Sequence, residues 1–218
     1  MSNFVYVLLA ALIGYVLGAI PFGFLYVKAT RKVDLRTVGS GRTGGTNSFR
    51  AAGLAVGVLT SISDALKGAA GVWIVNGLFR SVLDKSWLPW ALVTAGLMSV
   101  VGHNWSVFLK WAGGAGTGPN VGWSSALWPP MLPIALVVVV GLLLGVGMAS
   151  VASLAAAVVV PVVFAIRYFT GHGHLAYLVG GVVTAAVIIY ALRSNIKRIL
   201  NGTERLVGPR ARRQAPAK

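Results

Sequence analysis

Cysteine is absent from this 218-residue chain, and charged residues make up only 11% of it. Without cysteine there is no disulfide, no thiolate nucleophile and no metal site with sulfur ligands. A water-soluble domain of this length would not tolerate so little charge beside 56% hydrophobic residues and a mean hydropathy of +0.80. The composition therefore indicates an all-α polytopic membrane protein.

Acidic residues are scarce as well, because four Asp and Glu stand against nineteen Lys and Arg, for a net charge of +15. Such a balance can indicate a nucleic-acid-binding protein. Here the basic residues cluster beside apolar segments instead of forming a stripe on a soluble domain, so membrane topology explains them better. We expect membrane lipid as a partner, no nucleic acid and no obligate protein partner.

Apolar segments predict about seven transmembrane helices, at residues 4–27, 51–79, 88–103, 114–128, 131–148, 150–168 and 174–192. The fourth is short and weakly apolar, so it has to be buried among its neighbours. With the N-terminus outside and the C-terminus cytoplasmic, fifteen of the nineteen basic residues lie on the inner face, as the positive-inside rule requires. Six crossings would place the basic C-terminal segment outside. Residues 1–205 are expected to form a single integral-membrane domain, and residues 206–218 a basic disordered tail that lies on anionic lipid.

The long polar insertion of the chain is GSGRTGGTNSFR, residues 39–50. Its glycines let backbone N–H groups approach a ligand, and Ser40, Thr46 and Asn47 supply short neutral donors. Arg42 and Arg50 add planar cations, each able to bind an oxyanion through two hydrogen bonds. The pattern predicts an anion site, with a flexible loop between two spans as the alternative.

Under this topology further polar segments meet the insertion at the cytoplasmic face: Asp64 with Lys67, the loop that begins at His103, residues 147–150 and residues 193–204. Asp64 and Lys67 share one helix face, and such a pair in an apolar helix predicts a functional site, with a structural ion pair as the alternative. His103 can accept a proton from a hydroxyl or bind an anion, with a structural histidine as the alternative.

The other two histidines, His172 and His174, fall in an outer loop without a carboxylate partner, which makes a poor metal site. We therefore expect no metal.

Taken in order, these motifs resemble a known family. The set GSG..GGTN..R (39–50), D..KG (64–68), GH....FL...GG.G (102–116), G..S..S (147–153) and NI.R.L.G.E (195–204) is similar to that of the bacterial membrane glycerol-3-phosphate acyltransferases that use acyl-phosphate as donor. The resemblance implies seven spans in a bacterial plasma membrane, an active site facing the cytoplasm, and no metal or nucleotide cofactor. The implied reaction moves a fatty acyl group to the 1-hydroxyl of glycerol 3-phosphate, giving lysophosphatidic acid and phosphate.

The resemblance also implies roles for individual residues. Catalytic roles fall to Ser40, Arg50 and His103, and substrate-binding roles to Thr46, Asn47, Lys67, Gly113, Gly114, Ser150, Asn195 and Glu204. Backbone N–H groups and arginine suit the phosphates of both substrates and the tetrahedral oxyanion of acyl transfer. The proton of the attacking hydroxyl goes to His103 or to the phosphate of the substrate itself, and the sequence leaves both routes open.

The chain departs from the family pattern in its two glycine-rich segments. The family usually has asparagine in place of Arg42, alanine in place of Gly45, and lysine in place of Ala112 and Ala115. We interpret Arg42 as a substrate-binding residue that replaces part of the lost positive charge, with contact to lipid headgroups as the alternative. These departures keep two other functions open: a related enzyme with another donor or acceptor, and a small transporter or lipid-binding protein, which the lack of an internal repeat disfavours.

Overall fold

The computed structural model describes residues 2–208 and residue 211. These residues form helices and their connections, without a β-strand among them. The α-helices are α1 (Asn3–Ala19), α2 (Phe22–Arg31), α3 (Gly45–Ala52), α4 (Leu54–Phe79), α5 (Leu88–Asn104), α6 (Thr117–Leu127), α7 (Met131–Gly145), α8 (Ala149–Phe169), α9 (Leu175–Ala191) and α10 (Arg193–Leu200). Two short 3-10 helices, η1 (Leu35–Thr37) and η2 (Val107–Leu109), lie in the connections. The predicted all-α class is confirmed.

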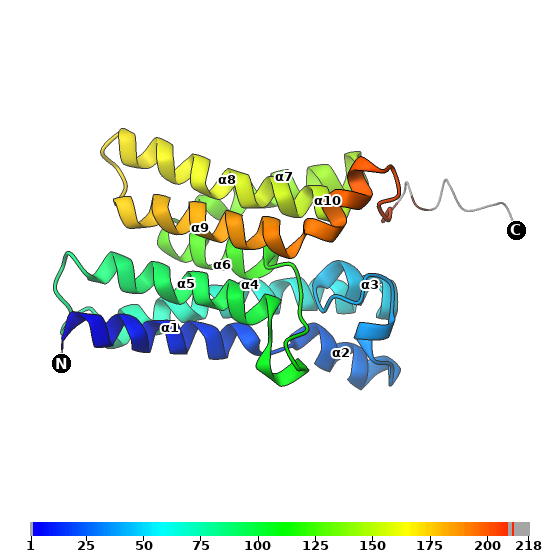
Figure 1. Ribbon diagram of the computed structural model, residues 1–218, viewed down its shortest axis with the longest axis horizontal. Coiled ribbons are helices and arrows are strands. Elements are labelled where there is room, and N and C mark those ends of the chain that lie inside the picture. The colour runs from blue at the N-terminus through cyan, green and yellow to red at the C-terminus, as the bar shows by residue number, and fades with distance from the viewer. Residues whose placement is uncertain (1, 209–210, 212–218) are drawn as a thin grey trace, which may run out of the picture.

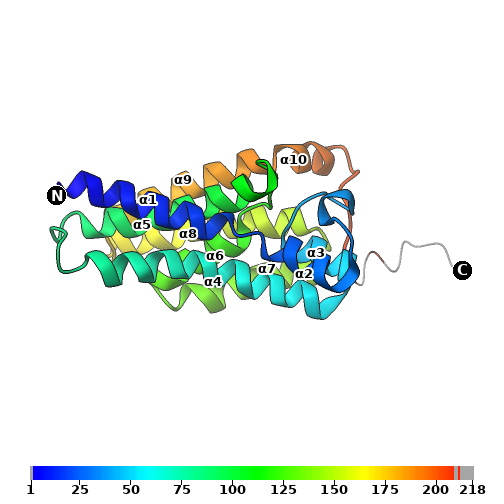
Figure 2. The same cartoon turned by 90° about the horizontal axis from the view of Figure 1, so that it is seen from below.

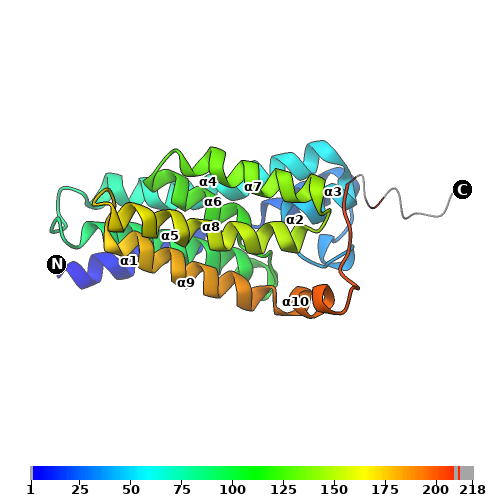
Figure 3. The ribbon, with the colours of Figure 1, turned by 90° about the horizontal axis from the view of Figure 1, so that it is seen from above.

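The long helices form a bundle in which the chain runs back and forth along one axis. Figure 1 shows α1, α4, α5, α6, α7, α8 and α9 side by side, and Figure 2 shows the same bundle from below. The N-terminus and the α4–α5 and α8–α9 connections lie at one end, whereas α2, α3 and α10 lie at the other (Figure 3). Polar segments that are far apart in the sequence therefore gather at one end of the bundle.

Helix length decides how many segments qualify as membrane spans. Among the described residues, four helical segments are both long and apolar enough: Asn3–Arg31, Leu54–Phe79, Leu88–Leu109 and Ala149–Phe169. A fifth is added if α9 and α10, which meet at 64°, count as one broken span. α6 has only eleven residues, or about 16 Å of helix, against a hydrocarbon core of about 30 Å. The structure thus gives four or five candidate spans, and the seven expected from hydropathy stay a prediction.

The first predicted span, residues 4–27, is two helices in the structure. α1 ends at Ala19 and α2 begins at Phe22, because Pro21 has no N–H to continue the helical hydrogen bonds. The break leaves the carbonyl oxygen of Ile20 accessible, and Lys67 Nζ donates to it at 2.9 Å. The kink therefore supplies an anchor for a lysine of α4.

Two other segments differ from the sequence-based expectation. The second half of the polar insertion is helical: Gly44 is extended, and α3 begins at Gly45 directly after it. At the C-terminal end, Val207 is buried and its N–H donates to Gly147 O at 2.7 Å, so packing extends past the expected boundary at 205. Of the predicted tail, residues 209–210 and 212–218 lie outside the described residues.

Small residues allow α1 and α5 to approach closely. Gly14 and Gly18 form a GxxxG pattern on α1, and a Cβ on either would overlap the backbone of α5 at Ala95 or Ser99. Beside this contact, the indole of Trp123 on α6 is fully buried and faces Gly96 of α5. This tight packing fixes the C-terminal half of α5, which carries His103.

Candidate active site

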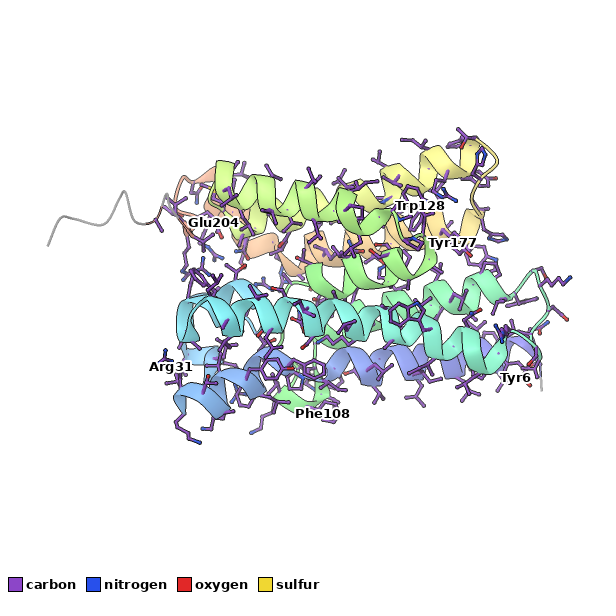
Figure 4. The ribbon with its side chains drawn as sticks, turned by 180° about the vertical axis from the view of Figure 1, so that it is seen from behind. Tyr6, Arg31, Phe108, Trp128, Tyr177 and Glu204 are labelled. Carbon is purple, nitrogen blue, oxygen red and sulfur yellow. The ribbon has the colours of Figure 1, made fainter. Side chains whose placement is uncertain are left out.

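A cavity of about 500 Å³ lies between α3, α4, α6, α7 and α8, and α10 and the segment that follows it also contribute to its lining. Nine of the twelve predicted site residues line it: Ser40, Arg42, Thr46, Asn47, Arg50, His103, Ser150, Asn195 and Glu204. Figure 4 shows Glu204 at the same end of the bundle as Arg31 and opposite to Tyr6. The other three predicted residues, Lys67, Gly113 and Gly114, do not line the cavity and contact residues that do.

Asn47 holds the glycine-rich segment in shape. Its Nδ2 donates to the carbonyl oxygens of Arg42 at 2.8 Å, Val38 at 2.9 Å and Leu35 at 3.3 Å. Its Oδ1 accepts from the N–H of Ser40 at 3.1 Å. These contacts occupy both N–H groups of the amide, so Asn47 orients Ser40 and Arg42 and keeps no donor for a ligand.

Arginine side chains gather at the polar end of the cavity. Arg42, Arg50 and Arg205 line it, and Arg193 and Arg198 act on Arg42 from α10. Burial lowers the pKa of Arg42, and the charges of Arg198 and Arg193 lower it further. The pKa of Arg50 is lowered by burial and then by Arg205, and its guanidinium has no hydrogen-bond partner among the described residues. A bound anion would relieve this repulsion, and the planar guanidinium suits phosphate.

Glu204 is the carboxylate within this group of cations, and it organises α8 and α10. Its Oε1 accepts from Ser150 Oγ at 3.0 Å and Asn195 Nδ2 at 2.9 Å, while its Oε2 accepts from Arg198 Nε at 2.9 Å. Because Asn195 gives its N–H to Glu204, its Oδ1 is turned to Arg42, whose Nη2 donates to it at 3.2 Å. Glu204 and Asn195 therefore position Arg42.

The guanidinium of Arg42 joins two parts of the chain. Its Nη1 donates to Gly114 O at 2.9 Å, and its Nη2 donates to Ala191 O at 2.5 Å and to Asn195 Oδ1. These contacts hold it inside the site, which does not fit the alternative of an arginine extended to lipid headgroups. Of its five N–H groups, the Nε–H and one Nη1–H make no hydrogen bond within the described residues.

A buried ionic cluster lies on the α4 and α5 side of the cavity. Lys67 Nζ is 2.9 Å from Asp64 Oδ1, 2.9 Å from His103 Nδ1 and 2.9 Å from Ile20 O. The separation of His103 Nδ1 and Asp64 Oδ1 is longer, at 3.5 Å. Asp64 and His103 line the cavity, whereas Lys67 lies behind them. The pair that the sequence indicated is thus part of a triad that includes His103 of another helix.

Gly113 and Gly114 are needed for close approach to His103. A Cβ on Gly113 would overlap the carbonyl oxygens of His103 and Asn104, and a Cβ on Gly114 would overlap Nε2 of the imidazole. The N–H of Gly114 donates to His103 O at 2.9 Å, so it is not directed at a ligand. The sequence assigned both glycines to substrate, whereas their contacts are with His103 and Arg42.

The other end of the cavity is apolar, and sequence reasoning missed its residues. One face of α7 contributes Leu132, Leu136, Val139 and Leu143, at intervals of four, three and four residues. α7 packs on α8 and α6 and barely touches α4, so the cavity extends between α7 and α4 with α6 as its floor. The spacing of these apolar residues on α7 is the one sequence signal that could have indicated the groove. The same spacing also occurs on a helix face that contacts lipid, so it does not distinguish the two.

Thr117, Ser153 and Arg205 also line the cavity without having been predicted. No group of three or more His, Cys, Asp or Glu suited to a metal ion occurs in the part of the chain that the structure describes.

Comparison with known proteins gives this site a family. A family model described as glycerol-3-phosphate acyltransferase matches residues 8–202. A glycerol-3-phosphate acyltransferase of Rubrobacter xylanophilus is 40% identical, covering 93% of this chain and 96% of that protein. Glycerol-3-phosphate acyltransferase 3 of Dehalococcoides mccartyi is 36% identical, covering 94% and 97%.

A solved structure is also similar over most of the chain. It is the crystal structure of PlsY, an integral membrane glycerol 3-phosphate acyltransferase, in its glycerol 3-phosphate form, with a TM-score of 0.79, 34% identity, and coverage of 93% of this chain and 96% of that one. A second structure, the lysophosphatidic acid form of PlsY, has a TM-score of 0.78 and 33% identity. The resemblance found in the sequence motifs is confirmed, and the chain belongs to the glycerol-3-phosphate acyltransferase family of integral membrane enzymes.

Proposed function

We propose that this protein transfers a fatty acyl group from acyl-phosphate to the 1-hydroxyl of glycerol 3-phosphate. The observation that carries the proposal is one cavity with arginines at one end and an apolar groove at the other. Both substrates present a phosphate, and the donor also has a hydrocarbon chain. A site for this reaction therefore needs cations beside an apolar wall, and this cavity has both.

The apolar groove supports a long acyl chain. Its α7 wall runs from Leu132 to Leu143, a rise of about 16 Å along the helix. Ile62 and Leu66 of α4 line the other side. Because α7 and α4 barely touch, a chain can enter sideways from the lipid without crossing the polar end.

The chemistry balances without a cofactor. The 1-hydroxyl oxygen attacks the acyl carbon, a C–O ester bond forms, and the tetrahedral oxyanion collapses with loss of inorganic phosphate as the C–O bond to phosphate breaks. The hydroxyl proton leaves on an oxygen or nitrogen base, and phosphate is already a good leaving group. We assign Ser40, Thr46 and Arg50 to binding phosphate or the oxyanion, because preorganised donors stabilise charge that develops in the transition state.

Arg42 is proposed to bind a substrate phosphate and to replace part of the charge that lysine would supply at Ala112 and Ala115. Its contact with Gly114 O brings the guanidinium beside that glycine-rich loop, and its remaining N–H groups are available for a phosphate oxygen. Glu204 and Asn195 hold it there, so these two residues influence the same ligand by positioning Arg42.

We also propose seven crossings of a bacterial plasma membrane, with the N-terminus outside and the active site facing the cytoplasm. The positive-inside rule supports this orientation, as does the opposite placement of the N-terminus and α10 in Figure 1. Reporter fusions test the orientation. A reporter that is active only in the cytoplasm should be active when it is fused after residue 205. Activity of a periplasm-dependent reporter at that position would overturn the topology.

The reaction is tested with purified protein and palmitoyl-phosphate, by measuring phosphate release with and without glycerol 3-phosphate. We expect release to depend on glycerol 3-phosphate and to match the lysophosphatidic acid formed. Release that does not depend on the acceptor would show hydrolysis of acyl-phosphate instead of transfer. Transfer to a different acceptor would identify a different acyltransferase. An absence of transfer from acyl-phosphate, with transfer from another acyl donor, would refute the assigned donor.

A further inference from the structure

We propose that Lys67 fixes His103 in the tautomer that carries its proton on Nε2. His103 then acts in the reaction as a hydrogen-bond donor and not as the base that accepts the hydroxyl proton. The catalytic part of this inference rests on the proposed acyl transfer, whereas the tautomer itself does not. Lys67 is here a positioning residue, because it lies behind the cavity lining and acts through His103.

The first step is the environment of the lysine. Lys67 Nζ has two hydrogen-bond partners at 2.9 Å, Ile20 O and His103 Nδ1. It also forms an ion pair with Asp64 Oδ1 at 2.9 Å, an oxygen that has no hydrogen-bond partner within the described residues. An ammonium has three N–H groups and no lone pair. At 2.9 Å from such a group, Nδ1 of His103 must present its own lone pair, so that nitrogen carries no proton.

The second step excludes the opposite arrangement. A proton on His103 Nδ1 would point at the lysine ammonium, whereas the carboxylate able to accept it, Asp64 Oδ1, is 3.5 Å away. The charged groups around the ring are Asp64 and Lys67 of α4 and Arg42 of the glycine-rich segment, two cations and one anion. A charged imidazolium would therefore add a third cation to a buried site with a single carboxylate.

The third step concerns the other ring nitrogen. A neutral imidazole that accepts at Nδ1 carries its hydrogen on Nε2. The ring lines the cavity, and Nε2 makes no hydrogen bond within the described residues. Gly114 packs against Nε2, and a Cβ there would overlap this nitrogen, which is not among the fully buried polar atoms without a partner in the described residues. The Nε2–H is thus available to a phosphate oxygen or to the oxyanion of the tetrahedral intermediate.

The consequence is a division of roles in the site. With Nδ1 bonded to Lys67 and Nε2 already protonated, His103 has no lone pair for the hydroxyl proton. The oxygens of Glu204 accept three hydrogen bonds, which hold this carboxylate in its structural role. The proton must therefore be accepted by a group other than His103.

Nitrogen NMR of the protein in lipid nanodiscs tests the tautomer without any substrate. The chain has three histidines, so ¹⁵N-histidine labelling and one His103→Gln spectrum assign the signals, with His172 and His174 as internal references. We expect the His103 proton on Nε2 alone. A proton on Nδ1, or a mixture of tautomers, would overturn the proposal whether or not the protein transfers acyl groups.

A lysine variant tests the cause. In Lys67→Met, Nδ1 loses its donor and faces Asp64, so we expect the proton to move to Nδ1. Lys67→Met leaves a buried carboxylate unpaired. If this variant does not fold, the double variant Asp64→Asn/Lys67→Met replaces it, and we expect both tautomers in the double variant. Lys197→Met is the matched control on exposed α10 and should leave the spectrum unchanged. A ring that stays purely Nε2-protonated without Lys67 would refute the role of the lysine.

Kinetics test what the proton does. The side-chain amide of glutamine donates an N–H but is not a base at neutral pH, so His103→Gln should retain turnover within about tenfold of the parent, whereas His103→Leu should lose about 10²-fold. Equal losses in the two variants would show that donation is not the function of His103. If the NMR result holds and no acyl transfer occurs with any donor, the proposed function fails and the tautomer assignment stands.

Discussion

Replacing Gly114 by alanine should disable the site while leaving the helix bundle intact. The backbone at Gly114 is outside the left-handed region, so alanine causes no backbone strain there. Its methyl group would, however, overlap the imidazole of His103 at Nε2, more than 1 Å inside the ordinary contact distance of 3.4 Å. Either the ring or the loop has to move.

Both movements damage the same chemistry. The ring cannot retreat without disturbing Nδ1, which is 2.9 Å from Lys67 Nζ. If the loop moves instead, it takes Gly114 O away from Arg42 Nη1, now 2.9 Å apart, and the guanidinium loses a support. A misplacement of about 1 Å in a catalytic constellation typically costs about 10²-fold in rate, or about 2.7 kcal/mol of transition-state stabilisation.

The assay is the initial rate of phosphate release from palmitoyl-phosphate with glycerol 3-phosphate, at matched amounts of folded protein. We expect kcat/KM of Gly114→Ala to fall by about 10²-fold. The control is Gly141→Ala in α7, where an added Cβ meets no atom within 4 Å, and it should behave as the parent. A Gly114→Ala enzyme within about threefold of the parent would show that His103 and Arg42 do not depend on this close approach.

Three further predictions concern charge and packing. Arg50→Ala should lower kcat by about 10²-fold. Arg50→Lys should recover only part of this rate, because lysine cannot make two parallel hydrogen bonds to one anion. A near-normal rate in Arg50→Ala would remove Arg50 from the mechanism. Arg42→Asn should raise KM for a phosphate substrate, and adding Ala115→Lys should restore part of the loss; equal effects of Ala115→Lys with and without Arg42 would mean that they do not share a ligand. Gly18→Leu should lower the free energy of unfolding in detergent by about 2 kcal/mol or more, because the leucine side chain meets the α5 backbone. The control Gly77→Leu should not, since position 77 faces open space. Equal melting temperatures of the two variants would contradict the close α1–α5 contact.

Most of what the sequence predicted about the site depended on local chemistry. The glycine, hydroxyl and arginine residues within residues 39–50 predicted an anion site, and in the structure Ser40, Arg42 and Arg50 line one cavity. The roles inside that set were less predictable. The sequence suggested Asn47 as a donor to a ligand, yet its amide contacts four backbone groups between Leu35 and Arg42, which no spacing rule reveals.

The sequence by itself determined the membrane class, the helical fold and the family, because composition, apolar segments and short motifs are properties of a chain segment alone. It also placed Asp64 and Lys67 on one helix face, since a separation of three residues fixes that direction. It did not determine how far each apolar segment continues as helix, and α6, only eleven residues long, shows the difference.

The tertiary structure alone decided which groups meet. Lys67 contacts Ile20, released by the break before α2, and His103, 36 residues further on in α5, and neither distance follows from any periodicity. The same holds for Arg42, which reaches Ala191 and Asn195 about 150 residues away. Such contacts depend on how closely helices approach, and in this bundle glycines such as Gly14 and Gly18 set that approach by allowing backbones to touch.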